Sequence, residues 1–97
     1  MPTYFSLVNW TDQGIKNVKD SPKRLDAVKK SIKELGGDLK VFYMLQGEND
    51  LMWIVDMPND EALAKLLLKI GAAGNVRTTT MRAYPEEEYR KIIGGLP

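Results

Sequence analysis

The stretch LKVFYMLQGENDLMWIVDM, residues 39–57, decides the fold of this chain. It contains two apolar runs, 39–46 and 51–57, which are rich in the branched and aromatic residues typical of β-strands. Only the four residues GEND, 47–50, separate them, and a connection this short predicts an antiparallel hairpin. Both runs are apolar at consecutive positions, whereas a strand with one face in water alternates apolar and polar residues. We therefore expect both faces of this sheet to be covered.

Two amphipathic helices are predicted on either side of the hairpin. Ser21 and Pro22 predict the start of the first, since a capping hydroxyl precedes a proline whose missing N–H costs nothing in the first helical turn. The second is capped at 59 or 60 and ends near Gly71 or Gly74. Each helix carries one apolar stripe at helical spacing, formed by Leu25, Val28, Ile32 and Leu35 in the first and by Leu63, Leu66, Leu67 and Ile70 in the second.

Further strands are predicted over 4–10 and 76–84, and a short helix follows Pro85. The resulting order of strand, helix, strand, strand, helix, strand is the ferredoxin-like arrangement of the α+β class. In this arrangement two helices lie on one face of a four-stranded antiparallel sheet. A chain of 97 residues with no linker or repeat is expected to form one domain over residues 1–97.

The second face of the sheet indicates how the protein assembles. Two helices cover one face only, so a monomer would leave a large apolar patch in water. We expect a symmetric homodimer in which two sheets pack face to face. The alternative is that the short C-terminal helix folds back across the open face.

Cysteine and histidine are both absent from the chain. Their absence excludes thiolate nucleophiles, disulfides, Cys or His zinc sites, His-ligated haem and Ser-His-Asp triads. No dense acidic loop of the calcium type is present, and we expect neither a metal nor a cofactor. With 14 Lys+Arg and 13 Asp+Glu the net charge is +1, which attracts neither nucleic acid nor an anionic membrane. Without a signal peptide or a long apolar run, the protein is expected in the cytoplasm.

Several segments resemble the GYD family of small bacterial and archaeal proteins, and the resemblance spans nearly the whole chain. They are LVNWTDQGIKNV (7–18), SPKR (21–24), GG (36–37), Gly47 with Asp50, and GNVRT (74–78). The resemblance implies a dimeric α+β barrel built from ferredoxin-like units, and no particular activity. The family signature is Gly-x-Tyr-Asp, and Asn49 stands here in place of its tyrosine.

The superfamily of dimeric α+β barrels includes cofactor-free monooxygenases, lactone isomerases, haem proteins and the ligand-binding domains of leucine-responsive regulators. Fold alone does not choose among these functions. The haem branch is disfavoured because its usual proximal histidine is missing from this chain.

The best local candidate for a ligand site is the exit of the first predicted strand. Asn9, Trp10 and Asp12 place amide, indole and carboxylate groups there, where pocket-lining loops are common. The structural alternative is that Thr11 or Asp12 caps a short helical turn and that Trp10 fills the core.

Hydroxyl groups on the other strands form a second set of candidates. Tyr43, Thr78 and Thr80 would orient a small ligand between sheet and helices, or serve only in structural hydrogen bonds. Arg77 and Arg82 would bind a carboxylate ligand, or pair with acidic residues at the surface. Trp53 is assigned to the core or to the dimer interface.

Three functions stay open from the residues. The favoured one is a homodimeric module that binds a small apolar or carboxylate-bearing molecule, or that regulates, without catalysis of its own. The first alternative is a cofactor-free enzyme of the monooxygenase or isomerase type, which requires an enclosed pocket with a buried Asp or Tyr facing an N–H or Arg donor. The second alternative is a purely structural oligomerisation unit.

Overall fold

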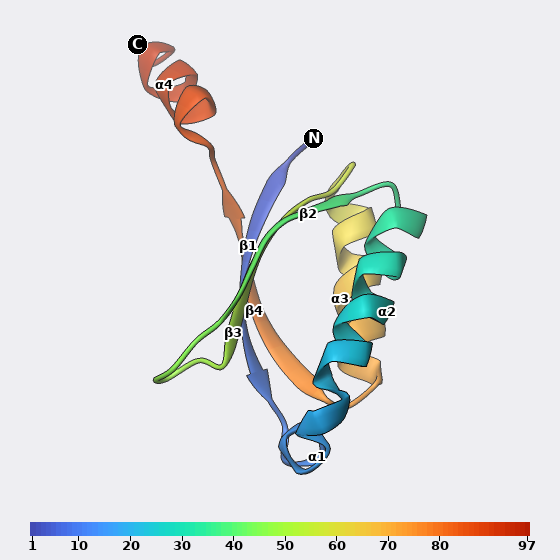
Figure 1. Cartoon of the computed structure of the whole chain (residues 1–97). Helices are drawn as coiled ribbons and strands as arrows, with labels where there is room; N and C mark the ends of the chain where they lie inside the picture. Colours follow the sequence, from blue (N-terminus) through green and yellow to red (C-terminus); the bar gives the residue numbers. More distant parts are fainter.

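The computed structural model describes the whole chain, from Met1 to Pro97. Figure 1 shows a curved sheet with two long helices on one side. The elements, in chain order, are β1 (Thr3–Trp10), α1 (Asp12–Lys16), a 3-10 turn (Val18–Asp20), α2 (Ser21–Glu34), β2 (Asp38–Met44), β3 (Leu51–Asp56), α3 (Asp60–Ala72), β4 (Val76–Ala83) and α4 (Glu86–Gly94). All four strands and the three longer helices predicted from the sequence are present.

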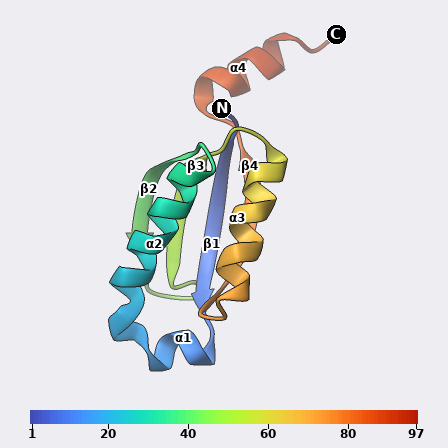
Figure 2. The same ribbon diagram turned by 90° about the vertical axis from the view of Figure 1, so that its right-hand side faces the viewer.

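The strands form one antiparallel sheet in the order β2-β3-β1-β4. This order and the position of α2 and α3 across one face (Figure 2) confirm the ferredoxin-like α+β fold. The GEND turn joins β2 to β3 as a hairpin, in agreement with the length of the connection. A shift of register between Leu39 and Val41 is the one irregularity in the pairing of β2 with β3.

The two helix starts differ in how they are capped. The Asn59 side chain accepts a hydrogen bond of 2.9 Å from the N–H of Ala62 and caps α3, as predicted. Ser21 does not cap α2, because the 3-10 turn runs directly into the helix and Ser21 is already its first residue. Pro22 still lies in the first turn, where its missing N–H is tolerated.

Alternate residues of the strands face the helices and form the core. On β1, the residues Tyr4, Ser6 and Val8 are buried, whereas the residues between them are only half-buried. The buried apolar cluster unites both helices and the inner strands, and it consists of Tyr4, Val8, Ile32, Leu51, Trp53, Val55, Met57, Leu66 and Ile70. The core therefore lies entirely between the sheet and the pair of helices.

The opposite face of the sheet is left uncovered. We call it the open face. Strand pairing places seven apolar side chains there, and they are Phe5, Leu7, Val41, Tyr43, Met52, Ile54 and Met81. The idea that the C-terminal helix covers this face is wrong, because α4 stands away from the sheet beyond the end of β4 (Figure 1). The ion pair of Arg82 with Glu88, at 3.1 Å, links α4 to β4.

Candidate small-molecule-binding site

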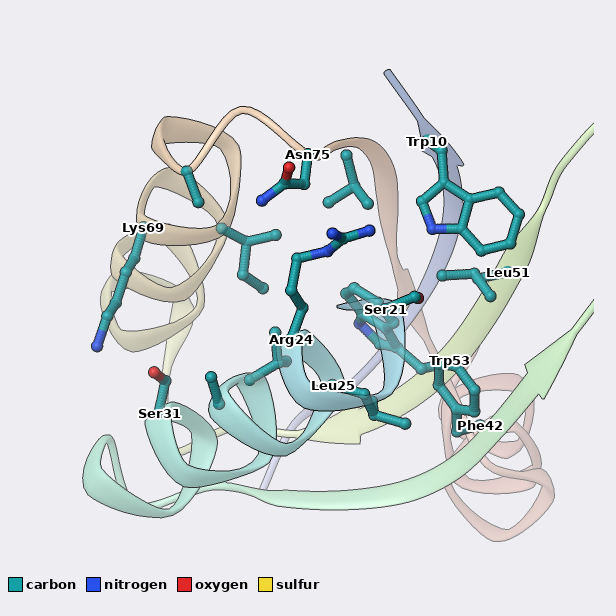
Figure 3. Close-up of a pocket in the computed structure, with 15 residues that line it drawn as sticks. Trp10, Ser21, Arg24, Leu25, Ser31, Phe42, Leu51, Trp53, Lys69 and Asn75 are labelled. Atoms are coloured by element: carbon teal, nitrogen blue, oxygen red, sulfur yellow. The ribbon is translucent and has the colours of Figure 1, made fainter. Parts of the chain in front are cut away.

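A cavity of about 180 Å³ lies between α2, α3 and the sheet, at the end of this layer nearest α1 (Figure 2). Fifteen residues line it (Figure 3), and two-thirds of them are hydrophobic. Its apolar wall includes Leu25 and Val28 of α2, Phe42 and Leu51 of the hairpin, Ile70 of α3 and Val76 of β4. Both predicted apolar helix stripes thus contribute to the wall.

Two tryptophans contribute buried indole N–H groups to this mostly apolar wall. Trp10 and Trp53 both line the cavity, and the Nε1 atom of each is buried without a hydrogen-bond partner. The Trp53 side chain is only 3% exposed. A buried donor that lacks a partner costs about 1–3 kcal/mol, and nearly all buried polar groups in native proteins have partners. Two residues of the cavity wall therefore carry buried donors that lack a partner within the protein.

The charged groups of the wall are of one sign. Arg24 and Lys69 line the cavity, whereas no aspartate or glutamate does, and neither cation forms a salt bridge. Arg24 is half-buried and donates hydrogen bonds to the main-chain oxygens of Asn17, at 3.0 Å, and Gly14, at 3.2 Å. Its guanidinium is thus held in place by neutral acceptors.

The helix α1 is fixed against the turn between α3 and β4. Thr11 donates from its N–H to the Asn75 carbonyl at 3.0 Å, and from its hydroxyl to the Gly74 carbonyl at 2.6 Å. Its hydroxyl oxygen also accepts from the N–H of Gly14 and so caps α1. Gly14 packs directly against Asn75, and a Cβ at this position would overlap the Asn75 carbonyl oxygen. These contacts set the carbonyl groups that hold Arg24.

Comparison with known proteins places this architecture in a family, because residues 4–93 match the model of the GYD domain. The chain belongs to the GYD family. One relative of this GYD protein is the glutamine synthetase and cystathionine beta-lyase binding protein of Thermus thermophilus. It is 27% identical over 86 residues, which cover 88% of this chain and 90% of that protein.

Solved structures share the fold of this GYD protein. A feast or famine regulatory protein from M. tuberculosis, solved with L-methionine, matches with a TM-score of 0.65 and 22% identity, over 88% of this chain and 51% of the regulator. The GYD protein thus spans about half the length of that regulator. A protein of known structure from Thermus thermophilus matches with a TM-score of 0.55 and 25% identity, over 88% of this chain and 95% of the other.

The residues that carry the GYD signature have a structural role in this protein. Gly47 adopts a φ of 125°, a conformation that favours glycine. The Asp50 carboxylate accepts from the N–H of Trp10 at 2.9 Å, and the N–H of Asp50 donates to the Asn9 side chain at 3.1 Å. Asn49, at the position of the family's tyrosine, accepts from the Asn9 amide at 3.3 Å. The signature turn therefore binds the end of β1.

The six candidate residues from the sequence do not converge on one site. Trp10 lines the cavity, whereas Asn9 bonds to the GEND turn and Asp12 is exposed on the first turn of α1. Tyr43 is 63% exposed on the open face. Thr78 and Thr80 lie on β4 opposite Val8 and Ser6 and outside the cavity wall; the Thr80 and Ser6 hydroxyl oxygens are 2.6 Å apart.

Six wall residues with polar side chains were not predicted as site residues from the sequence: Ser21, Arg24, Ser31, Trp53, Lys69 and Asn75. Trp53 was assigned to the core or the dimer interface, and it does belong to the core cluster. Arg24 follows Ser21-Pro22 and directly precedes Leu25 of the apolar stripe. This position at the edge of the stripe was the sequence signal that could have placed Arg24 near the cavity.

A second polar cluster lies at the opposite end of the sheet and outside the cavity wall. The hydroxyl of buried Tyr4 donates to the Asp60 carboxylate, and the Arg82 guanidinium lies 5.7 Å from the centre of the Tyr4 ring. Burial raises the pKa of the Tyr4 hydroxyl above its ordinary value, and the Asp60 hydrogen bond and charge raise it further. Arg82 also pairs with Glu88, so this cluster links β1, α3 and α4.

An exposed ion network lies at the far edge of the sheet. Lys40 is 3.0 Å from Asp38 and 3.8 Å from Asp56, and Lys33 is 3.6 Å from Asp38. The hydrogen bond with Lys40 holds the pKa of Asp38 below its usual value, and Asp38 in turn raises the pKa of Lys40. Because both groups are solvated, the pair adds little to stability.

The fold gathers no group of three or more acidic side chains that would hold a metal ion. None of its helices has the length and apolar character needed to span a bilayer.

Proposed function

We propose that this GYD protein is a homodimeric module that binds a small molecule and acts in regulation, without catalysis of its own. The observation that carries the proposal is the cavity beneath α2 and α3, where the indole N–H groups of Trp10 and Trp53 are buried and unpartnered. A mostly apolar cavity with a few polar groups is the usual form of a small-molecule site.

The chemistry of the wall favours binding over catalysis. The wall contains Ser21 and Ser31 but no carboxylate, tyrosine, cysteine or histidine. A serine becomes a nucleophile only beside a group that accepts its proton. The enzyme alternative required a buried Asp or Tyr facing a donor inside the pocket, and the one cluster of that kind, Tyr4 with Asp60, lies outside the wall.

The names of similar proteins agree with a binding and regulatory role. The Thermus relative is named for binding two enzymes, and the mycobacterial regulator was solved with an amino acid. We extend to this protein only the class of role, a small module that binds and regulates.

The open face supports the dimeric part of the proposal. Seven apolar side chains on one continuous sheet surface, including Phe5, Tyr43 and Ile54, form the kind of patch that marks an interaction site. A second copy of the chain presents the same surface, so two sheets related by a two-fold axis would cover each other. The helices and the cavity would stay on the outside of such a dimer.

Native mass spectrometry of the purified protein tests ligand binding. We expect an extra mass that disappears on denaturation, or that appears after incubation with a bacterial small-molecule extract. Ala27→Phe places a ring at the cavity wall and should abolish the extra mass. Ala64→Phe, an exposed alanine on α3 outside the wall, is the matched control and should keep it. A protein that never carries a bound molecule would contradict the proposal.

The mass of the assembly tests the dimer. Ile54→Asp puts a charge on the open face and should yield a folded monomer, while Leu68→Asp on α3, where Leu68 is 74% exposed, should stay dimeric. Circular dichroism confirms that both variants are folded. A wild-type protein that is monomeric at micromolar concentration would overturn this part.

A further inference from the structure

The charged residues in the cavity wall favour a ligand that carries a negative charge. Its wall holds the cations Arg24 and Lys69 and no acidic residue. Arg24 is half-buried among apolar groups, where charge interactions are stronger than in water. A buried charge normally has a partner of opposite sign, and Arg24 has none within the protein. An anion bound in the cavity would supply such a partner.

The donors near Arg24 are arranged for a single acidic group. A guanidinium has five N–H donors, and Arg24 uses its terminal nitrogens on the carbonyls of Asn17 and Gly14. In Figure 3 the indole nitrogen of Trp10 lies on the edge of the ring turned toward the Arg24 side chain. The N–H of Trp10 is buried without a partner, so a carboxylate that reached it from the side of Arg24 would complete its hydrogen bonding.

The remaining space limits the apolar part of the ligand. The cavity measures about 180 Å³, and an apolar cavity of about 150 Å³ accommodates benzene. Phe42, Leu51 and Ile70 in the wall offer apolar contacts to a group of that size.

We propose that the cavity binds a small organic monocarboxylate whose apolar body is about the size of one aromatic ring, with the carboxylate held by Arg24 and the N–H of Trp10. This inference rests on the proposed function and adds to it the ligand class and the anchor. In Figure 3 the Lys69 side chain points away from Arg24 and Trp10, so Lys69 is not assigned to the carboxylate.

The experiment compares 3-phenylpropionate with its uncharged amide, 3-phenylpropionamide, by calorimetry at pH 7. The chain has two tryptophans, Trp10 and Trp53, both in the wall, so a change in their fluorescence reports binding at this site. We expect the carboxylate to bind at least tenfold more tightly than the amide. Equal affinities would overturn the inference while leaving the proposal of a binding module intact.

Variants of Arg24 locate the anchor. Arg24→Met should bring the carboxylate to the affinity of the amide, without weakening binding of the amide. Arg24→Lys keeps the charge and should retain part of the preference, which a purely structural role would not predict. Lys30→Met, which removes an exposed cation of the same helix outside the wall, is the control and should keep the full preference. An equal loss in Lys30→Met would overturn the assignment of Arg24.

The test also separates the two proposals when no probe binds. If neither probe binds but native spectra show a bound molecule that Ala27→Phe displaces, the ligand class is wrong and the binding function stands. If neither probe binds and no bound mass is found, both proposals are wrong.

Discussion

The Asp50 carboxylate accepts a hydrogen bond of 2.9 Å from the main-chain N–H of Trp10. This bond ties the hairpin turn of the family signature to the strand end that carries a tryptophan of the cavity. Asp50→Ala would leave the N–H of Trp10 without its acceptor, and we expect a loss of about 1–3 kcal/mol in the free energy of unfolding. Urea denaturation measures the loss. Glu48→Ala, in the same turn and exposed, should change stability by less than about 0.5 kcal/mol, and an equal effect would contradict the role of Asp50.

Gly14 is expected to tolerate no side chain. In Gly14→Ala the new Cβ would overlap the Asn75 carbonyl oxygen and lie 2.9 Å from its carbonyl carbon. Because main-chain atoms cannot move aside without displacing α1, we expect a loss of about 3 kcal/mol or more. Thermal melting gives the comparison with Gly94→Ala, where nothing lies within 4 Å of the added Cβ. A Gly14→Ala protein as stable as Gly94→Ala would show that α1 is not fixed against Asn75.

Alkaline pH should destabilise the protein through Tyr4. Burial and Asp60 raise the pKa of its hydroxyl in the folded state, so the folded chain holds this proton more tightly than the unfolded chain. The stabilisation is complete below the ordinary tyrosine pKa of about 10 and is lost as the pH rises through the folded-state pKa. Tyr4→Phe should reduce the slope of stability against pH above about 10. The exposed residue Tyr89 on α4 supplies the control, because Tyr89→Phe should retain the wild-type slope.

A charge at Trp53 should prevent folding. The side chain is 3% exposed in the core cluster, and Trp53→Asp would either bury a carboxylate in that apolar cluster or place it in a large void. We expect a loss of several kcal/mol, enough to unfold a domain of this size. Trp53→Phe keeps an apolar ring and should remain folded, with a smaller loss. Circular dichroism and melting distinguish the two variants, and a cooperatively melting Trp53→Asp protein would contradict the burial of this residue.

The strands and long helices were predictable because their signals are local. Leu25, Val28 and Ile32 repeat at helical spacing, and the GEND turn is short enough to force a hairpin. The Ser-Pro pair predicted a capping role for Ser21 that was wrong, since the preceding residues 18–20 themselves turn as a 3-10 helix and continue into α2.

The site was less predictable because it depends on contacts between distant segments. The Arg24 side chain is held by the main-chain carbonyl groups of Gly14, in α1, and of Asn17, the residue after α1. Helix α1 is in turn held by a hydrogen bond to Asn75, which is distant along the chain. Nor does an unbroken apolar run such as 41–45 reveal which residues face the helices; strand pairing puts Tyr43 on the open face and Phe42 in the cavity wall. The direction of α4 was likewise undetermined, because its sequence pattern fits both a folded-back and an extended helix.

The alternation of side chains along β1 fixes the length of that strand. Leu7 faces the open side and Val8, its neighbour, lies in the core. One residue inserted between Ser6 and Leu7, with the strand from Leu7 onward kept in register, would turn Phe5 toward the helices. It would carry Tyr4 and Ser6 to the opposite side, because side chains in a strand repeat with a period of two. Insertions and deletions should therefore be tolerated after β4 but not within β1, so homologous chains should differ in length beyond β4 and agree in length along β1.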